Sequence, residues 1–123
     1  MGEHILADFF GCDGETLDDV KKIQEIMREA AHRANAAIVS HEFHRFSPWG
    51  VSGAVIIQES HLTIHTWPEH RYAAVDLFTC GESLDLWKAM DYLREKLGCS
   101  GMETTEMGRG IFKSGGIDSS GSF

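Results

Sequence analysis

The sequence predicts an α+β protein, a two-layer α/β sandwich in which a mostly antiparallel sheet is covered on one face by two helices. Two segments carry apolar residues at three- and four-residue steps, the spacing of an amphipathic helix. Between them, residues 36–80 contain β-branched and aromatic runs separated by short turns, which favours antiparallel neighbours. Because each helix has one apolar stripe, both can cover the same face of the sheet.

The first elements expected are a strand and a helix. Ile5 to Cys12 form a short mixed run closed by a Gly/Asp cluster, which predicts a strand followed by a turn. The helix is expected to begin near Thr16 as its N-cap, with Asp18 and Asp19 at the positive end of the helix dipole. Its apolar stripe consists of Leu17, Val20, Ile23, Met27, Ala30 and Ala34.

The remaining elements follow from turn residues and a second stripe. Residues 48–50 and 67–69 interrupt the segment 36–80, so about four strands are expected there. A second helix should end at Gly98, a favoured C-terminal residue. Residues 101–107 predict a last strand, and the Gly/Ser-rich segment 108–123 is expected to be a flexible tail. The second helix has the stripe Leu86, Met90, Leu93 and Leu97, with Trp87 beside it.

Length and charge limit the function. The chain has 123 residues, which suits one domain over 1–123, and a formal net charge of −8. That charge argues against binding nucleic acid or an anionic membrane and suits a cationic small molecule better. No apolar run approaches the roughly 20 residues that cross a bilayer, so we expect a soluble, cytoplasmic protein. Cys12, Cys80 and Cys99 have no spacing typical of a disulfide framework or a thiolate metal site.

One predicted strand combines apolar and chemically active residues. If Leu62 to Trp67 is a strand, alternation places Leu62, Ile64 and Thr66 on one face. The other face then carries His61, Thr63, His65 and Trp67. A sheet face of this kind builds a pocket in some proteins and is simply solvated in others, and the alternation alone favours neither interpretation.

Four segments together resemble a known family. They are Phe-His-Arg-Phe at 43–46, Gly-Val-Ser-Gly at 50–53, Glu-Ser-His-Leu-Thr-Ile-His-Thr-Trp-Pro-Glu at 59–69 and Asp-Leu-Phe-Thr-Cys-Gly at 76–81. In order and spacing they resemble the prokaryotic S-adenosylmethionine decarboxylases, pyruvoyl enzymes of polyamine synthesis that are made as inactive proenzymes. The similarity runs from about His4 to Leu97, and the tail departs from the family pattern.

The resemblance implies that the chain cuts itself between Glu59 and Ser60. The products would be a β chain, 1–59, and an α chain, 60–123, with a pyruvoyl group derived from Ser60 and no external cofactor. That group forms a Schiff base with the substrate amine and accepts the electrons left by carbon dioxide. His65 matches the proton carrier of the processing reaction. Ser52 matches a hydroxyl that assists processing, although its local sequence equally fits an ordinary turn serine.

The resemblance also assigns residues to decarboxylation and to substrate binding. Cys80 matches the proton donor to the substrate Cα, and a thiol is mostly protonated at neutral pH. Phe46 and Trp67 match aromatic residues that bind the adenine and the sulfonium cation. Glu69 is placed to bind the ribose hydroxyls. The family also implies a homodimer of processed protomers.

Three alternatives remain open at this point. The same fold and pyruvoyl chemistry could act on L-arginine or L-ornithine, because all three substrates share the amino-acid head. A metal-binding protein is suggested by the pairs His41/His44 and His61/His65, but these spacings match no zinc signature and no metal site is predicted. A non-catalytic homologue is disfavoured because Ser60, His65 and Cys80 occur together.

Overall fold

The computed structural model describes residues 2–58, 60–80, 84–109, 112–113 and 116–117. The strands are β1 Gly2–Phe10, β2 Ile38–Arg45, β3 Val51–Ile57, β4 Ser60–Trp67, β5 Tyr72–Thr79, β6 Gly101–Arg109, β7 Phe112–Lys113 and β8 Gly116–Ile117. The helices are α1 Gly14–Leu17, α2 Val20–Arg33 and α3 Leu86–Lys96, with a 3-10 turn, η1, at Pro68–His70.

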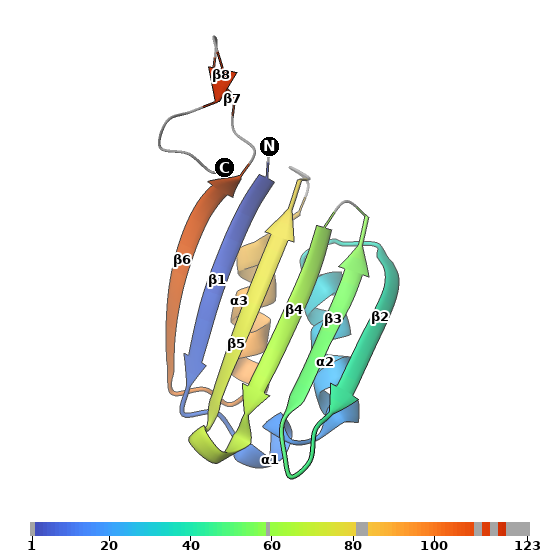
Figure 1. Cartoon of the computed structure of the whole chain (residues 1–123), viewed down its shortest axis with the longest axis vertical. Helices are drawn as coiled ribbons and strands as arrows, with labels where there is room; N and C mark the ends of the chain where they lie inside the picture. Colours follow the sequence, from blue (N-terminus) through green and yellow to red (C-terminus); the bar gives the residue numbers. More distant parts are fainter. Residues whose placement is uncertain (1, 59, 81–83, 110–111, 114–115, 118–123) are drawn as a thin grey trace.

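Six strands form one antiparallel sheet in the order β2-β3-β4-β5-β1-β6. Helices α2 and α3 lie side by side across one face of this sheet (Figure 1). None of the helices among the described residues lies over the other face, which we call the open face (Figure 1). The predicted two-layer α+β sandwich is therefore confirmed, and the four strands expected over residues 36–80 are β2 to β5.

The core lies between the sheet and the two helices. In β5 every second residue is buried, from Ala73 to Thr79. In β4 the buried positions are Ser60, Leu62, Ile64 and Thr66. The predicted face assignment of β4 is confirmed, since Leu62 and Ile64 are fully buried while His65 and Trp67 are exposed. The helices contribute their predicted stripe residues, among them Ile23, Met27, Met90 and Leu93.

The prediction that Thr16 caps the first long helix is wrong. Residues 14–17 form the separate short helix α1, and α2 begins at Val20 with Asp19 as its N-cap, whose side chain accepts from the Lys22 N–H at 3.1 Å. The physical reason is a competing local contact, because the buried Thr16 hydroxyl donates to the Asp13 carboxylate at 2.7 Å. This hydrogen bond lowers the pKa of the Asp13 carboxyl.

The predicted second helix and last strand are confirmed. Helix α3 is followed by Gly98 with a positive φ of 66°, the backbone geometry that favours glycine after a helix. Strand β6 pairs with β1 up to Arg109, so the structure continues into the segment expected as a tail. The short strands β7 and β8 pair with each other, and residues 110–111, 114–115 and 118–123 lie outside the described part of the chain.

Candidate active site

Ser60 and Cys80 meet where β4 begins and β5 ends. Ser60 is opposite Thr79 in the β4–β5 register, and its side chain is buried, with 9% exposure. The Ser60 Oγ atom accepts a hydrogen bond from the Cys80 backbone N–H at 3.3 Å. The Cys80 thiol is free and exposed. The structure thus brings two of the predicted site residues together; Glu59, the other side of the predicted cleavage site, lies outside the described residues.

His65 and Ser52 form a second pair, on the open face of the sheet. The two residues are opposite each other in the β3–β4 register. The Ser52 Oγ and His65 Nδ1 atoms are 2.7 Å apart, and the tautomer of the imidazole decides which of them donates. His44 is opposite Ser52 on β2 and Ala74 is opposite His65 on β5, so this pair lies in a row that crosses four strands.

The two pairs are separated within one chain. Ser60 and His65 are five residues apart on β4, about 16 Å at the usual rise of a strand. An odd separation on a strand also puts their side chains on opposite faces, as the burial pattern of β4 shows. A proton carrier must come within hydrogen-bond reach of the reacting atoms. His65 therefore cannot serve the Ser60 of its own chain in this conformation.

Aromatic side chains gather around the His65 end of the open face. The Trp67 ring is 5.2 Å from the Tyr72 ring and 6.4 Å from the His65 ring. Tyr72 in turn stacks on Phe10 at 5.5 Å. The predicted binding residues Phe46 and Trp67 are 48% and 40% exposed, so their rings are available to a ligand. The Phe46 ring packs edge-on against His44, at 4.6 Å.

Sequence reasoning missed Tyr72, Asp8 and Phe10. The Tyr72 hydroxyl donates to the Asp8 carboxylate, a contact that raises the pKa of Tyr72 to about 12. The three residues lie on β5 and β1, which are adjacent in the sheet but separated by most of the chain. Only the strand order brings them beside Trp67, and no local motif indicates it.

Glu69, the predicted partner of the ribose hydroxyls, lies in η1 directly after β4. Its side chain is exposed, two residues after Trp67, the last residue of β4. The residue after η1, Arg71, has a positive φ of 51° and returns the chain into β5. Glu69 is therefore next to the aromatic group and away from Ser60.

Four hydrogen bonds fix the strands that carry Ser52 and His65. The Thr66 hydroxyl accepts from the Val51 N–H and donates to the Leu17 carbonyl, both at 2.8 Å. Asp18 accepts from the Gly50 N–H at 2.8 Å and from the Arg45 guanidinium at 2.7 Å. The turn before α2 therefore holds the β2–β3 turn and the end of β4 in place.

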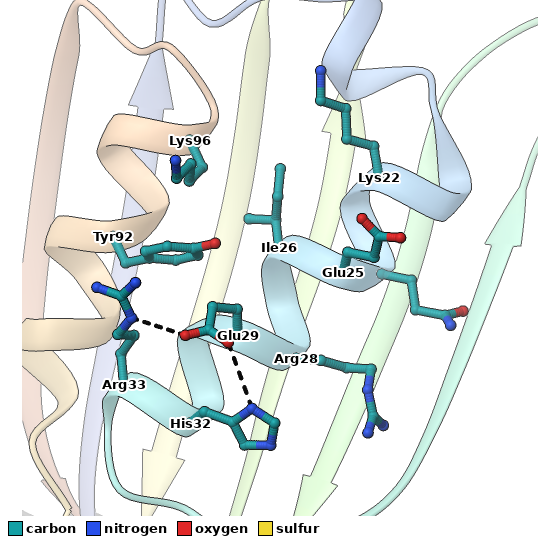
Figure 2. Close-up of a pocket in the computed structure, with 10 residues that line it drawn as sticks. Lys22, Glu25, Ile26, Arg28, Glu29, His32, Arg33, Tyr92 and Lys96 are labelled. Atoms are coloured by element: carbon teal, nitrogen blue, oxygen red, sulfur yellow. Dashed lines mark hydrogen bonds and ion pairs between the residues drawn. The ribbon is translucent and has the colours of Figure 1, made fainter.

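A groove between α2 and α3 lies on the side of the helices away from the sheet (Figure 2). Its lining is mostly charged, and Glu29 forms an ion pair with Arg33 at 2.8 Å and a longer contact with His32 at 3.6 Å. The Arg33 guanidinium lies over the Tyr92 ring, 4.8 Å from its centroid. None of the predicted site residues lines this groove, so it is separate from the site.

Neither a metal-binding cluster nor a membrane-spanning helix occurs in the part of the chain that the structure describes. Within that part of the chain, no three His, Cys, Asp or Glu side chains are grouped as a metal site needs. His41 lies 2.8 Å from the Arg28 guanidinium, whereas His44 packs against Phe46, so that pair does not converge. None of the helices that the structure describes has the length and apolar character to span a bilayer.

The arrangement defines a class of protein: a small α+β protein built on a six-stranded antiparallel sheet, with a hydroxyl and a thiol at one strand end and a hydroxyl–imidazole pair on the open face. Comparison with known proteins identifies the family. The S-adenosylmethionine decarboxylase family profile matches residues 3–110. The chain therefore belongs to the S-adenosylmethionine decarboxylase family, as the resemblance in the sequence implied, and it is an enzyme.

Individual relatives agree with this assignment. The chain is 54% identical over 117 residues to the S-adenosylmethionine decarboxylase proenzyme of Thermosipho africanus, covering 95% of this chain and 90% of that one. It is 55% identical over 113 residues to the proenzyme of Caldicellulosiruptor saccharolyticus, covering 92% and 91%. The crystal structure of the adenosylmethionine decarboxylase from Aquifex aeolicus superposes with a TM-score of 0.85 at 37% identity, covering 96% and 98%.

Proposed function

We propose that this chain is a self-processing, pyruvoyl-dependent decarboxylase of S-adenosyl-L-methionine. Its product would be decarboxylated S-adenosylmethionine, the aminopropyl donor for spermidine and other polyamines. The observation that carries the proposal is the Ser60–Cys80 contact at the junction of β4 and β5, in a chain of this family. A serine that becomes the reactive group must lie beside the residue that later delivers a proton to the substrate.

Processing begins with the Ser60 hydroxyl. Its oxygen attacks the carbonyl carbon of Glu59 and converts the peptide link into an ester. Elimination across the Cα–Cβ bond of Ser60 releases the chain 1–59 with its carboxylate and leaves a dehydroalanine. The imine tautomer of this residue adds water and loses ammonia, which leaves the pyruvoyl group at the start of the chain 60–123. Burial of Ser60 and the hydrogen bond from the Cys80 N–H support this step, because they fix the hydroxyl in one orientation.

The pyruvoyl group supplies an electron sink for decarboxylation. The surroundings of Ser60 fit such a group, because a carbonyl oxygen there can accept the hydrogen bond that the Cys80 N–H now donates to Ser60 Oγ. The Cys80 thiol is exposed on the residue whose N–H contacts Ser60, and in this proposal it supplies a proton to the substrate Cα. We therefore assign Cys80 as the proton donor.

His65 acts, in this proposal, on the Ser60 of a second copy of the chain. Within one chain the two residues are about 16 Å apart on opposite faces. The open face also presents exposed large apolar residues that a second copy would cover, namely Phe10, Ile56, Trp67 and Met107. A two-fold homodimer through the open faces brings the Ser60 end of each sheet to the His65 end of the other.

The substrate is expected to be a cation with a flat base. Trp67, Tyr72 and Phe46 offer aromatic faces to an adenine and a sulfonium. Asp8 and Glu69 add carboxylates at the same end of the sheet, and the net charge of −8 favours a cationic ligand. Arginine and ornithine lack the adenine, so they would leave these aromatic faces without a partner.

Two measurements test the proposal. Intact-mass spectrometry of the purified protein should find the chains 1–59 and 60–123, the latter lighter by one ammonia than a serine-started chain. Carbon dioxide release should then be faster with S-adenosylmethionine than with arginine or ornithine at equal concentration. A single stable 13.7 kDa species would contradict self-processing, and preference for arginine would contradict the substrate assignment.

A further inference from the structure

Two thiols outside the site are in direct contact. Cys12 follows β1 and Cys99 follows α3, and their Sγ atoms are 3.1 Å apart although the residues are 87 positions apart in the sequence. Cys12 is fully buried in the core, and Cys99 is partly exposed. Both are free thiols. The spacing of these cysteines in the sequence matches no known framework and does not predict that they pair.

The backbone on each side of the two cysteines is held by hydrogen bonds. The Ser100 N–H donates to the Phe10 carbonyl at 3.0 Å, and the Asp13 N–H donates to the Leu97 carbonyl at 2.9 Å. Arg71 adds a third hydrogen bond, in which its Nε–H donates to the Cys12 carbonyl at 2.7 Å. The two thiols are therefore kept facing each other, so a bond between them needs little backbone movement.

The contact also gives the two thiols different pKa values. The hydrogen bond from the Cys99 thiol, with a smaller effect of the Arg71 charge, lowers the pKa of Cys12. The same hydrogen bond raises the pKa of Cys99. Cys12 is thus the better nucleophile, whereas Cys99 is the thiol that a reagent in solution can reach.

We propose that Cys12 and Cys99 form a reversible disulfide when the protein meets a low-molecular-weight disulfide as oxidant. The partly exposed Cys99 sulfur attacks one sulfur of the oxidant, and the Cys99 proton leaves with the first small thiol. The Cys12 thiolate then attacks the Cys99 sulfur and displaces the second small thiol. The protein loses two electrons and two protons, and the two small thiols that are released take up these electrons and protons.

The position of the two cysteines gives this bond a specific consequence. Cys12 lies before the Glu59–Ser60 link and Cys99 lies after it. If the chain cuts itself as proposed above, the disulfide covalently joins the chain 1–59 to the chain 60–123. Oxidation would then hold together two chains that otherwise associate only through packing and hydrogen bonds.

The test uses the full-length protein treated with oxidised glutathione, after which the remaining thiols are alkylated. We expect one alkylated thiol for each pair of processed chains, in place of three in the reduced protein. In electrophoresis without reductant the chains 1–59 and 60–123 should run as one species, and dithiothreitol should separate them. Three alkylated thiols after oxidation, or glutathione adducts with separate chains, would overturn the proposal.

Three variants separate this inference from the proposed function. Ser60→Ala removes the hydroxyl needed for cleavage, and its uncut chain should still form the disulfide and lose two alkylation sites. Cys80→Ser removes the exposed thiol and should leave the disulfide intact, whereas Cys99→Ser should abolish it. Failure of Ser60→Ala to oxidise would overturn the disulfide whatever the outcome of self-processing.

Thermal unfolding gives an independent measurement. A disulfide that closes so long a stretch of chain should raise the Tm of the oxidised Ser60→Ala protein by roughly 10 °C. Oxidised glutathione should leave the Tm of the Ser60→Ala, Cys99→Ser double variant unchanged. An equal change in both proteins would mean that the oxidant acts elsewhere.

Discussion

The Ser52 hydroxyl oxygen and the His65 Nδ1 atom are 2.7 Å apart across the β3–β4 pair. This contact orients the imidazole on the open face, as a proton carrier requires. Replacing His65 with Ala should lower the rate of self-cleavage by about 10²- to 10⁴-fold, and Ser52→Ala by about tenfold. The measurement is the time course of fragment formation in gel electrophoresis. Thr63→Ala, on the same face of β4, is the matched control, and equal rates in all three variants would refute the assignment.

The separation of Ser60 and His65 leads to a prediction about subunits. His65→Ala chains should be cut when they are unfolded and refolded together with Ser60→Ala chains, because each mixed dimer contains one intact Ser60 and one His65 on different subunits. Ser60→Ala chains refolded alone should give no fragments, and His65→Ala chains refolded alone should give them only at the slow rate of that variant. Mass spectrometry distinguishes the two chains, and cleavage confined to unmixed wild-type protein would show that His65 acts within its own subunit.

Trp67 tests the substrate assignment. Its exposed ring lies 5.2 Å from Tyr72, which places two aromatic faces together. Trp67→Leu should raise the KM for S-adenosylmethionine by roughly 30-fold, since stacking and cation–π contacts each contribute about 1 kcal/mol. Kinetics of carbon dioxide release measure this change. Trp87→Leu, on the exposed side of α3, is the control and should leave KM unaltered.

Thr66 provides a test of the fold. Its buried hydroxyl bonds to Val51 and Leu17, and Thr66→Val leaves a buried N–H and a carbonyl without that partner. We expect the free energy of unfolding to fall by about 1–3 kcal/mol. Urea denaturation followed by circular dichroism measures it. Thr63→Val, at a half-buried open-face position, should change the midpoint much less.

The lowered pKa of Asp18 predicts that the stability of the fold depends on pH. The Arg45 guanidinium, followed by the Gly50 N–H, lowers the pKa of Asp18. A carboxyl group whose pKa is lower in the folded protein than in the unfolded chain stabilises the fold at pH values above its unfolded pKa. This contribution is lost as the pH falls through the folded pKa. From pH 6 to pH 3, Asp18→Asn should therefore lose less stability than the wild type in urea titrations. Asp91→Asn, at an exposed position of α3, should lose as much as the wild type.

Local patterns were sufficient for most of the fold. The alternation of Leu62 and Ile64 with His65 predicts the two faces of β4, because side chains on a strand point alternately to opposite sides. The stripe of α3 and the glycine after it predict that helix and its end for an equally local reason. The start of α2 was not predicted correctly, because the Thr16 hydroxyl, which was expected to cap this helix, donates a hydrogen bond to the Asp13 carboxylate instead.

What the sequence alone determined is the family, the class of fold and the identity of the candidate residues, since these depend on local periodicity and on motifs within short segments. The tertiary structure decided which of those residues meet. Strand order brings Cys80 to Ser60 and places Tyr72 and Asp8 beside Trp67. It also brings Cys12 against Cys99. Such contacts depend on the pairing of segments far apart in the chain, which no local pattern records.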